Sequence, residues 1–165
     1  MRSSESVRQR CCLGLGSRAD AHGTRYREGP WVTASMHISL MLAVPSAPVA
    51  ADWYGRALGA AELWSLGSVV GLEIEGAPFF LHESTGTGFG SPAEFGATTV
   101  RVEVFSEDPD AFIARAVAAG ADGSVDEISD HQAPWGVHRQ GRFIDPFGHV
   151  WHVGDKSPLN PFPHP

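Results

Sequence analysis

The alternation of apolar and polar positions predicts one helix and four strands in the first half of the chain. The apolar run at 37–45 is typical of a buried strand. The segment 46–60 predicts a helix, because Ser46 can cap its start, Pro48 fits its first turn and Gly59 can end it. Apolar runs separated by Gly or Pro then predict three strands, at 61–67, 69–76 and 77–84.

The same order of elements recurs in the second half. A strand is expected at 98–105, followed by a helix at 108–120 with Asp108 as its cap and Gly120 at its end. Between the halves, the stretch 84–96 is rich in Gly, Ser and Thr and is interpreted as a linker. Three further strands are expected at 124–132, 141–146 and 149–154.

Constant offsets indicate an internal duplication. Pro48 and Pro109 are 61 residues apart, and the segment 71–82 lies over 141–152 at an offset of 70. The difference of nine residues between the two offsets is expected in a loop at 130–140. The sequence therefore predicts an α+β fold of two βαβββ modules. The modules are expected at about 37–84 and 97–155.

Length and composition fit one globular domain without a membrane span. The 165 residues are 42% hydrophobic and 19% charged, so a buried core is expected. No apolar run reaches the roughly 18 residues that a membrane-spanning helix needs. The formal charge of −7 argues against a nucleic-acid partner, because duplex binding needs a basic face.

The two ends of the chain differ from the rest. Residues 1–35 contain six Arg against three acidic residues, a net charge of +3, which leaves −10 for the remainder because the total is −7. Three interpretations stay open: a disordered tail, a transit-type peptide, or untranslated sequence before a start at Met36. The tail and the mis-set start are favoured, because no amphipathic helix pattern is visible. The domain is expected at 36–157, and 158–165 is expected as a Pro-rich tail without helix or strand.

Cysteine usage gives an expectation about location. Cys11 and Cys12 are the two cysteines of the chain, and their adjacency fits neither a disulfide framework nor a metal site. Because none occurs in 36–165, nothing there requires an oxidising compartment, and a cytoplasmic location is expected.

Three motifs carry a resemblance to a known superfamily. Trp53-Tyr54 followed by RALGA resembles a Phe-Tyr…Leu-Gly helix end, and DPFGHVW at 145–151 resembles a final hairpin. The run at 130–149 resembles a Trp-Gly…Arg…Gly…Asp-Pro-Phe-Gly-His sequence. Together they resemble the vicinal oxygen chelate superfamily of glyoxalases, bleomycin-resistance proteins and extradiol dioxygenases, in its bleomycin-resistance-like branch. The resemblance covers about 37–155 and implies a mixed, cup-shaped sheet with helices on the outside, commonly in a homodimer.

The resemblance also implies where a metal would be held. In metal-using members the first and last strands of each module supply one ligand each, at positions that fall here on Ser39, His82, Arg101 and His152. Arg stays protonated and cannot ligate a metal, and Ser is a poor ligand. His82 and His152 are therefore the metal candidates; no cofactor is predicted, and a divalent metal is left open.

The two histidines also have a possible role without metal. Both are expected to face one cavity, where they would bind a ligand or transfer a proton near neutral pH, unless they are half-buried and bonded to backbone. His149 lies an odd number of positions from His152, so it points to the other face and is expected to be structural. Arg101 is expected to pair with Glu103 or, as the less favoured alternative, to hold an anionic ligand.

The predicted loop 130–140 combines aromatic and titratable side chains, and functional residues concentrate on such loops. Trp135 is expected to be a lid or stacking wall over a planar ligand, unless it only plugs the barrel end. The predicted substrate-binding residues are Ser39, His82, Arg101, Trp135, His138 and His152.

Three functions are compatible with these residues. The leading hypothesis is binding of a small organic molecule, such as sequestration of an antibiotic or a toxic metabolite. The alternative is a metal-dependent lyase, isomerase or dioxygenase of the glyoxalase type. The third is a dimeric accessory protein with a vestigial pocket.

Overall fold

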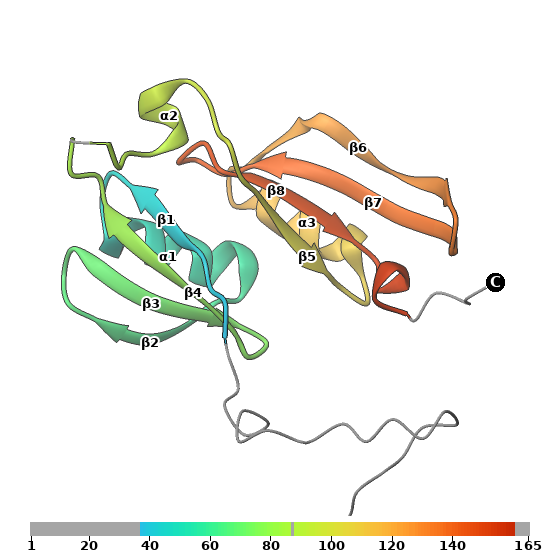
Figure 1. Cartoon of the computed structure of the whole chain (residues 1–165), viewed down its shortest axis with the longest axis horizontal. Coiled ribbons are helices and arrows are strands. Elements are labelled where there is room, and N and C mark those ends of the chain that lie inside the picture. The colour runs from blue at the N-terminus through green and yellow to red at the C-terminus, as the bar shows by residue number, and fades with distance from the viewer. Residues whose placement is uncertain (1–36, 87, 161–165) are drawn as a thin grey trace, which may run out of the picture. The chain divides into compact units, whose positions relative to one another are not determined.

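The computed structural model describes residues 37–86 and 88–160, and its folded unit begins at Ser39 (Figure 1). The interpretations of 1–35 and of 161–165 concern residues outside this range. The predicted α+β class with two βαβββ modules is confirmed. The first module consists of β1 (Met41–Val44), α1 (Ala47–Leu58), β2 (Ala61–Ser65), β3 (Val69–Ile74) and β4 (Ala77–Glu83).

The second module repeats this order after a linker that contains one short helix. That helix, α2 (Pro92–Phe95), has a capping box formed by Ser91 and Glu94, so the predicted linker is not wholly without structure. The module consists of β5 (Arg101–Phe105), α3 (Pro109–Ala118), β6 (Asp122–Ala133), β7 (Gly136–Ile144) and β8 (Val150–Gly154).

Each module forms a four-stranded mixed sheet with the same strand order. The orders are β1-β4-β3-β2 and β5-β8-β7-β6, with the first and last strands of each module parallel and the other pairs antiparallel. Leu81 and Trp151 occupy equivalent places, since they pair with Leu42 and Val102 in the first strands. The 70-residue offset therefore holds for β4 and β8.

The offset does not hold for β3 and β7. Val70 pairs with Leu81 and Phe143 pairs with Trp151, so the third strands are related by 73 residues. The expected overlay of 71–82 on 141–152 is therefore wrong over its first part. Eight residues connect the paired Gly71 and Phe80, but only five connect the equivalent pair Ile144 and Val150, so β7 is shifted by three residues.

The expected loop at 130–140 is wrong, because these residues form a β-hairpin. Strands β6 and β7 have 12 and 9 residues where β2 and β3 have 5 and 6, and only Pro134 and Trp135 connect them. Gly136 follows with a φ of 126°, which an L side chain rarely adopts. The extra residues of the second half thus lengthen a hairpin.

The expectation that the C-terminal segment lacks helix is also wrong at its start. Ser157–Leu159 form a turn of 3₁₀ helix, η1. Pro158 suits its first turn, where a missing backbone N–H leaves nothing unsatisfied.

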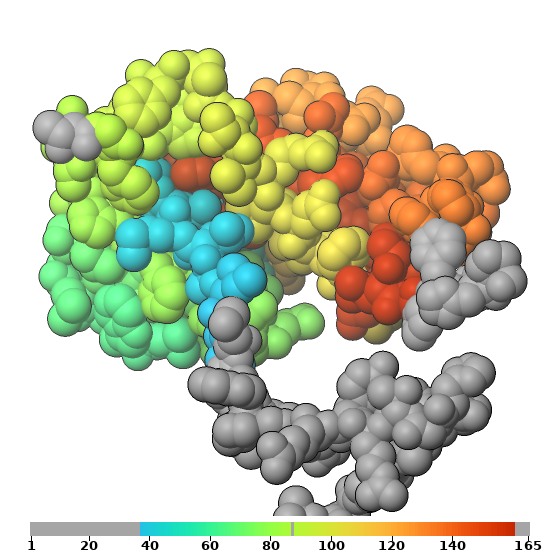
Figure 2. Space-filling model, viewed as in Figure 1, coloured from blue at the N-terminus to red at the C-terminus, as the bar shows by residue number. Residues whose placement is uncertain are grey.

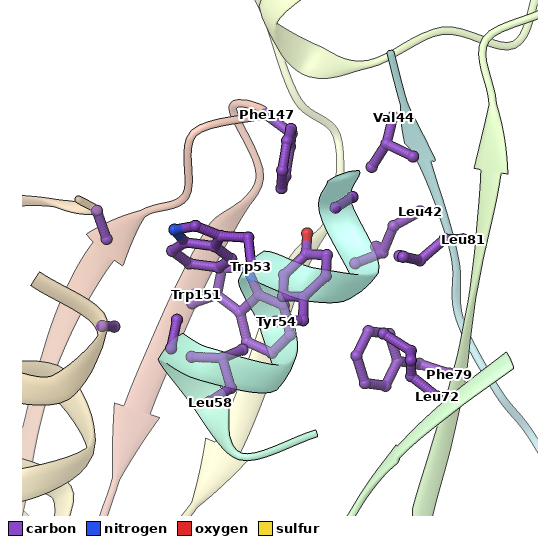
Figure 3. Packing of buried hydrophobic residues seen from close by; sticks show 14 of the residues in the cluster. Leu42, Val44, Trp53, Tyr54, Leu58, Leu72, Phe79, Leu81, Phe147 and Trp151 are labelled. Carbon is purple, nitrogen blue, oxygen red and sulfur yellow. The ribbon is translucent and has the colours of Figure 1, made fainter. Parts of the chain in front are cut away.

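The core lies between the helices and one face of each sheet. Helix α1 contacts β3, β4 and α3, and α3 contacts β6, β7 and β8. Trp53 and Tyr54 of α1 project among Phe79 of the first sheet and Phe147 and Trp151 of the second module (Figure 3). One continuous apolar cluster therefore joins the two modules.

A buried carboxylate reinforces this joint. Asp145 is 3% exposed and accepts hydrogen bonds from Tyr54 Oη at 2.6 Å, from Trp151 Nε1 at 2.9 Å and from the backbone nitrogens of Phe147 and His149. Burial, followed by the charge of Asp145 and its hydrogen bond, raises the pKa of Tyr54 well above its usual value. The Asp-Pro-Phe-Gly-His motif is thus a structural device.

His149 completes the joint, in agreement with its expected structural role. Its ring is buried, and Nε2 donates to the backbone oxygen of Ala43 at 2.8 Å, so the second module is bonded to the first strand of the first.

The remaining face of each sheet, which we call the open face, points away from the core. In the second sheet Phe143, Trp151 and Val153 are buried in the core. Their neighbours along the strands point the other way, since side chains alternate. In the part of the chain that the structure describes, no helix is both long and apolar enough to cross a membrane.

Candidate ligand-binding pocket

A pocket of about 180 Å³ lies on the open face of the second sheet. Its lining comes from β5, β7, β8, the turn between β6 and β7, and η1, and includes Glu103, Phe105, Trp135, His138, His152 and Gly154. Three of the predicted substrate-binding residues, Trp135, His138 and His152, are therefore brought together.

Strand register explains why these side chains converge. Glu103 pairs with His152 between the parallel strands β5 and β8, so their side chains share one face. His138 lies two positions before Gln140, which pairs with Gly154, and so projects from the same face.

His138 fits because Gly154 has no side chain. A Cβ at Gly154 would lie 2.6 Å from His138 Cε1 and 2.8 Å from its Nε2, closer than real Cβ contacts. The imidazole therefore rests directly on the backbone of β8, and a glycine at 154 is a steric requirement of the site.

His138 is held at one ring nitrogen. Its Nδ1 lies 2.9 Å from Asp155 Oδ1 and 3.1 Å from Ser157 Oγ. The carboxylate can only accept, so Nδ1 carries the proton. His138 is 8% exposed and belongs to the lining of the pocket.

Asp155 is fixed as an anion by its own hydrogen bonds. It accepts from the backbone nitrogens of Arg139 and Ser157, both at 2.8 Å, as well as from His138. Burial alone would raise the pKa of Asp155, but the bonds from Arg139, Ser157 and His138 outweigh it and hold the pKa far below its usual value. Asp155 therefore stays charged at neutral pH.

A second carboxylate–histidine pair lies across the pocket. His152 Nδ1 and Glu103 Oε1 are 3.6 Å apart, with side chains that are 18% and 51% exposed. This distance is a charge contact rather than a hydrogen bond, so the pair is held less firmly than His138 and Asp155.

Trp135 stands at the hairpin turn next to His138. The two ring centroids are 6.2 Å apart at an interplanar angle of 65°, and Trp135 Nε1 donates to Ser157 Oγ at 3.2 Å. Ser157 thus contacts both rings and sets their relative orientation.

The other three predicted residues lie outside this pocket. Ser39 donates from Oγ to the backbone oxygen of Pro78 at 2.6 Å. His82 donates from Nδ1 to its neighbour's backbone oxygen at 2.6 Å, and its ring meets the edge of Phe89. His82 is therefore a half-buried histidine that is bonded to the backbone, as the second of the two expectations for it states.

The expected pairing of Arg101 with Glu103 is wrong. Glu103 faces His152 instead, and Arg101 is exposed with no ion-pair partner among the residues that the structure describes. Only Val102 separates the two residues along β5, but the parallel register places Arg101 opposite Val150 and Glu103 opposite His152.

The residues present do not fit a metal site of the kind the superfamily implies. Ala43 of β1 pairs with His82, and Glu103 of β5 pairs with His152. Ser39 and Arg101 are therefore not the register partners of the two histidines. Within residues 37–86 and 88–160, no three His, Cys, Asp or Glu side chains are grouped so that they could hold a metal ion.

Asp155, Ser157 and Gly154 were not foreseen as parts of the site. The signal was a Gly-Asp pair at the end of the last strand, followed by Lys-Ser-Pro, a combination typical of a turn. The sequence pattern alone does not say that this turn folds back onto His138.

Comparison with solved structures identifies the fold. The TioX protein of Micromonospora sp. ML1 matches with 27% identity and a TM-score of 0.56, over 73% of this chain and 98% of that one. A glyoxalase/bleomycin resistance protein of Albidiferax ferrireducens T118 matches with 17% identity and a TM-score of 0.56, over 73% and 99%. A bleomycin-binding protein in complex with bleomycin matches with 15% identity and a TM-score of 0.55, over 73% and 98%. No protein-family model and no curated protein matches the sequence.

The expected resemblance to the vicinal oxygen chelate superfamily is therefore confirmed at the level of the fold. Each of the three solved structures is covered almost entirely, so the shared part is the whole two-module domain.

Proposed function

We propose that this chain, which has the fold of the glyoxalase and bleomycin-resistance proteins, binds a small organic molecule in the pocket on the open face of its second sheet. The observation that carries the proposal is the composition of the pocket. An apolar wall from Phe105 meets two imidazoles and an indole in one hollow. Such a mixture of apolar surface with a few placed polar groups is typical of sites for small molecules.

Sequestration of an antibiotic or toxic metabolite is the activity that this site supports best. A bleomycin-binding protein of the same fold was solved with bleomycin. Sequestration needs only affinity, which aromatic burial and hydrogen bonds can provide without a reaction. The metal-dependent lyase, isomerase or dioxygenase alternative would need ligands that the described residues do not supply.

We also propose that the protein forms a homodimer in which the second chain enlarges the site. We propose a cytoplasmic location for it. A pocket of about 180 Å³ is smaller than the roughly 300–1,000 Å³ of sites for drug-sized ligands. On the open face of the first sheet, Met41, Phe80, Gly71 and Trp64 form one register row, in which Trp64 stacks on Phe80. Met41 and Trp64 are 49% and 41% exposed, and the segment of β1 lies at the surface in Figure 2. Exposed apolar rows of this kind favour association.

Ligand screening tests the proposed function. The full-length protein is screened by thermal shift against planar aromatic compounds and bleomycin, since a molecule that binds the native state raises the melting temperature. Trp135→Ala should lower the affinity for a hit about 10-fold by loss of the stacking wall. Val137→Ala, an exposed change on the same hairpin, should leave the affinity unchanged. A screen without any hit, or a hit insensitive to Trp135→Ala, would contradict the proposal.

The mass in solution tests the dimer. Light scattering should give the mass of two chains, and a Met41→Asp change in the exposed row should shift it toward one. A monomer at all concentrations would contradict the proposed dimer and leave the pocket proposal to the ligand screen.

A further inference from the structure

The two ring nitrogens of His138 have different surroundings. Nδ1 is bonded to Asp155 and Ser157, whereas Nε2 has no hydrogen-bond partner among the described residues. Every fully buried side-chain nitrogen or oxygen among the described residues has a hydrogen-bond partner. Because Nε2 has none, it is not fully buried. Nε2 therefore reaches the pocket as an unused hydrogen-bonding atom.

The carboxylate behind the ring determines what Nε2 can do. Because Asp155 keeps a proton on Nδ1, the neutral ring presents a lone pair at Nε2 and acts there as an acceptor. When Nε2 gains a proton, the resulting imidazolium stays bonded to the Asp155 carboxylate, which stabilises its charge. The pair can therefore accept a proton without any rearrangement of the ring.

We propose that the His138–Asp155 pair takes the acidic proton of the bound molecule, so that the pocket selects planar ligands with a phenol-type hydroxyl and holds them as oxyanions. This inference rests on the proposed function, because it names the chemical class of that ligand. The ligand O–H bond breaks and an N–H bond forms at His138 Nε2. The oxyanion then accepts a hydrogen bond from that new N–H, and no other reactant is needed.

The surrounding charges favour a phenol over a carboxylic acid. A carboxylic acid is already ionised at neutral pH and would bring a second negative group next to Glu103 and Asp155. A phenol enters neutral, so it is desolvated at little cost, and becomes charged only when His138 has taken its proton. Its ring suits the walls formed by Trp135 and Phe105.

The other titratable groups near His138 are engaged elsewhere. Glu103 of β5 faces His152 of β8, His131 of β6 contacts Ser129, Arg139 of β7 bonds Asp110 and Asp130, and Lys156 bonds Glu107. The ligand proton is therefore assigned to His138, with His152 as the competing acceptor to be separated by mutation.

Binding of a matched pair of dyes tests the inference. 4-Nitrophenol and 4-nitroanisole differ in the acidic proton, which the methyl ether lacks. The wild type should bind the phenol at least 10-fold more tightly, because a hydrogen bond to a charged group is worth about that factor. Below the pKa of the free phenol, the bound dye should show the absorption band of its anion.

Variants identify the group that takes the proton. His138→Gln should abolish both the preference for the phenol and the anion band, while His152→Gln should keep the band. His131→Gln is the matched control, since His131 pairs with His138 across the hairpin and lies outside the pocket lining. A near-native melting temperature of the variants would show that they fold.

Asp155 is a positioning residue, and its role has a spectroscopic readout. Nitrogen NMR of the imidazole should find the Nδ1–H tautomer of His138 in the wild type. In Asp155→Asn the amide can donate to Nδ1, so the proton should move to Nε2 and the anion band should be lost.

The outcomes separate this inference from the proposed function. If the phenol does not bind, or binds no better than its ether, proton transfer is overturned, while a hit sensitive to Trp135→Ala in the ligand screen would still support the pocket. If no compound of any class binds, the proposed function fails as well. An anion band that persists in His138→Gln would also overturn the inference.

Discussion

The open faces of the two sheets have the same strand arrangement and opposite chemistry. His82 and His152 stand at equivalent places on β4 and β8. The neighbour of His82 on the first strand is Ala43, whereas the neighbour of His152 is Glu103. The duplicated backbone therefore repeats the position of a histidine without repeating what it can bind.

The third strands extend this contrast. Opposite His82 lies the apolar Val69, and opposite His152 lies Arg142, whose guanidinium is bonded to Asp126. On the first face the neighbours of the histidine are thus apolar, while the second face carries charges and the pocket. The two modules therefore share one strand order and expose different side chains on their open faces.

A ring resting on a glycine is common to both faces. A Cβ at Gly71 would lie 2.6 Å from Trp64 Cε2, just as one at Gly154 would lie 2.6 Å from His138 Cε1. The same steric device holds an indole against Phe80 in one sheet and an imidazole against Asp155 in the other.

Breaking the joint between the modules should have the largest effect, because both faces depend on it. Asp145→Ala leaves Tyr54 Oη and Trp151 Nε1 buried without their acceptor, and should lower the free energy of unfolding by about 3–5 kcal/mol. Urea unfolding measures this loss. Asp126→Ala, which removes an ion pair with Arg142, should cost less than about 1 kcal/mol, and equal losses would contradict the role of the joint.

Replacing Gly154 or Gly71 by alanine should affect ligand affinity differently on the two faces. Gly154→Ala forces His138 aside and should cost about 1–3 kcal/mol together with most ligand affinity. Gly71→Ala displaces the more exposed Trp64, so we expect a loss near the lower end of that range and no change in affinity for the pocket ligand. Calorimetric titration of both variants checks the difference, and equal affinity losses would contradict it.

Acid sensitivity should be a property of the second face. The pKa of Asp155 is lowered in the folded state, so its stabilising contribution is complete above the unfolded value of about 4 and is lost as the pH falls below that value toward the folded pKa. Asp155→Asn should therefore lose stability at neutral pH and show a flatter decline of melting temperature in acid. Parallel curves for the two proteins between pH 7 and acid would speak against this linkage.

The smallest effects are expected at the two equivalent histidines. His152→Ala should weaken ligand binding only a few-fold, since its contact with the half-exposed Glu103 is worth less than about 1 kcal/mol. His82→Ala should leave binding unchanged, because His82 lies outside the pocket lining. A larger loss in His82→Ala than in His152→Ala would reverse the assignment of the two faces.

The sequence was informative where the signal is local. Helix caps, turn glycines and the constant offsets predicted two βαβββ modules. Trp135, His138 and His152 were predicted from the sequence and line one pocket, but their role in binding stays a prediction. The long hairpin was missed because β6 is exposed along most of its length and shows no clean alternation of apolar and polar residues.

Strand register and contacts between residues far apart in the sequence could not be predicted from local patterns. The pairing of Glu103 rather than Arg101 with His152 depends on how β5 settles against β8, which counting back from a helix does not determine. Asp155 reaches His138 across 17 residues of chain, and this contact is set by the turn after β8.

The joint at Asp145 has a consequence for engineering this scaffold. Every hydrogen bond that Asp145 accepts comes from inside the joint, and His149 bonds Ala43 there, so none of these groups borders the pocket. A library that randomises the pocket positions on β5, β7 and β8 would leave the joint intact. Such a library could change the recognised molecule while retaining the fold. The Asp-Pro-Phe-Gly-His motif, which identifies the fold, would then carry no information about the bound molecule.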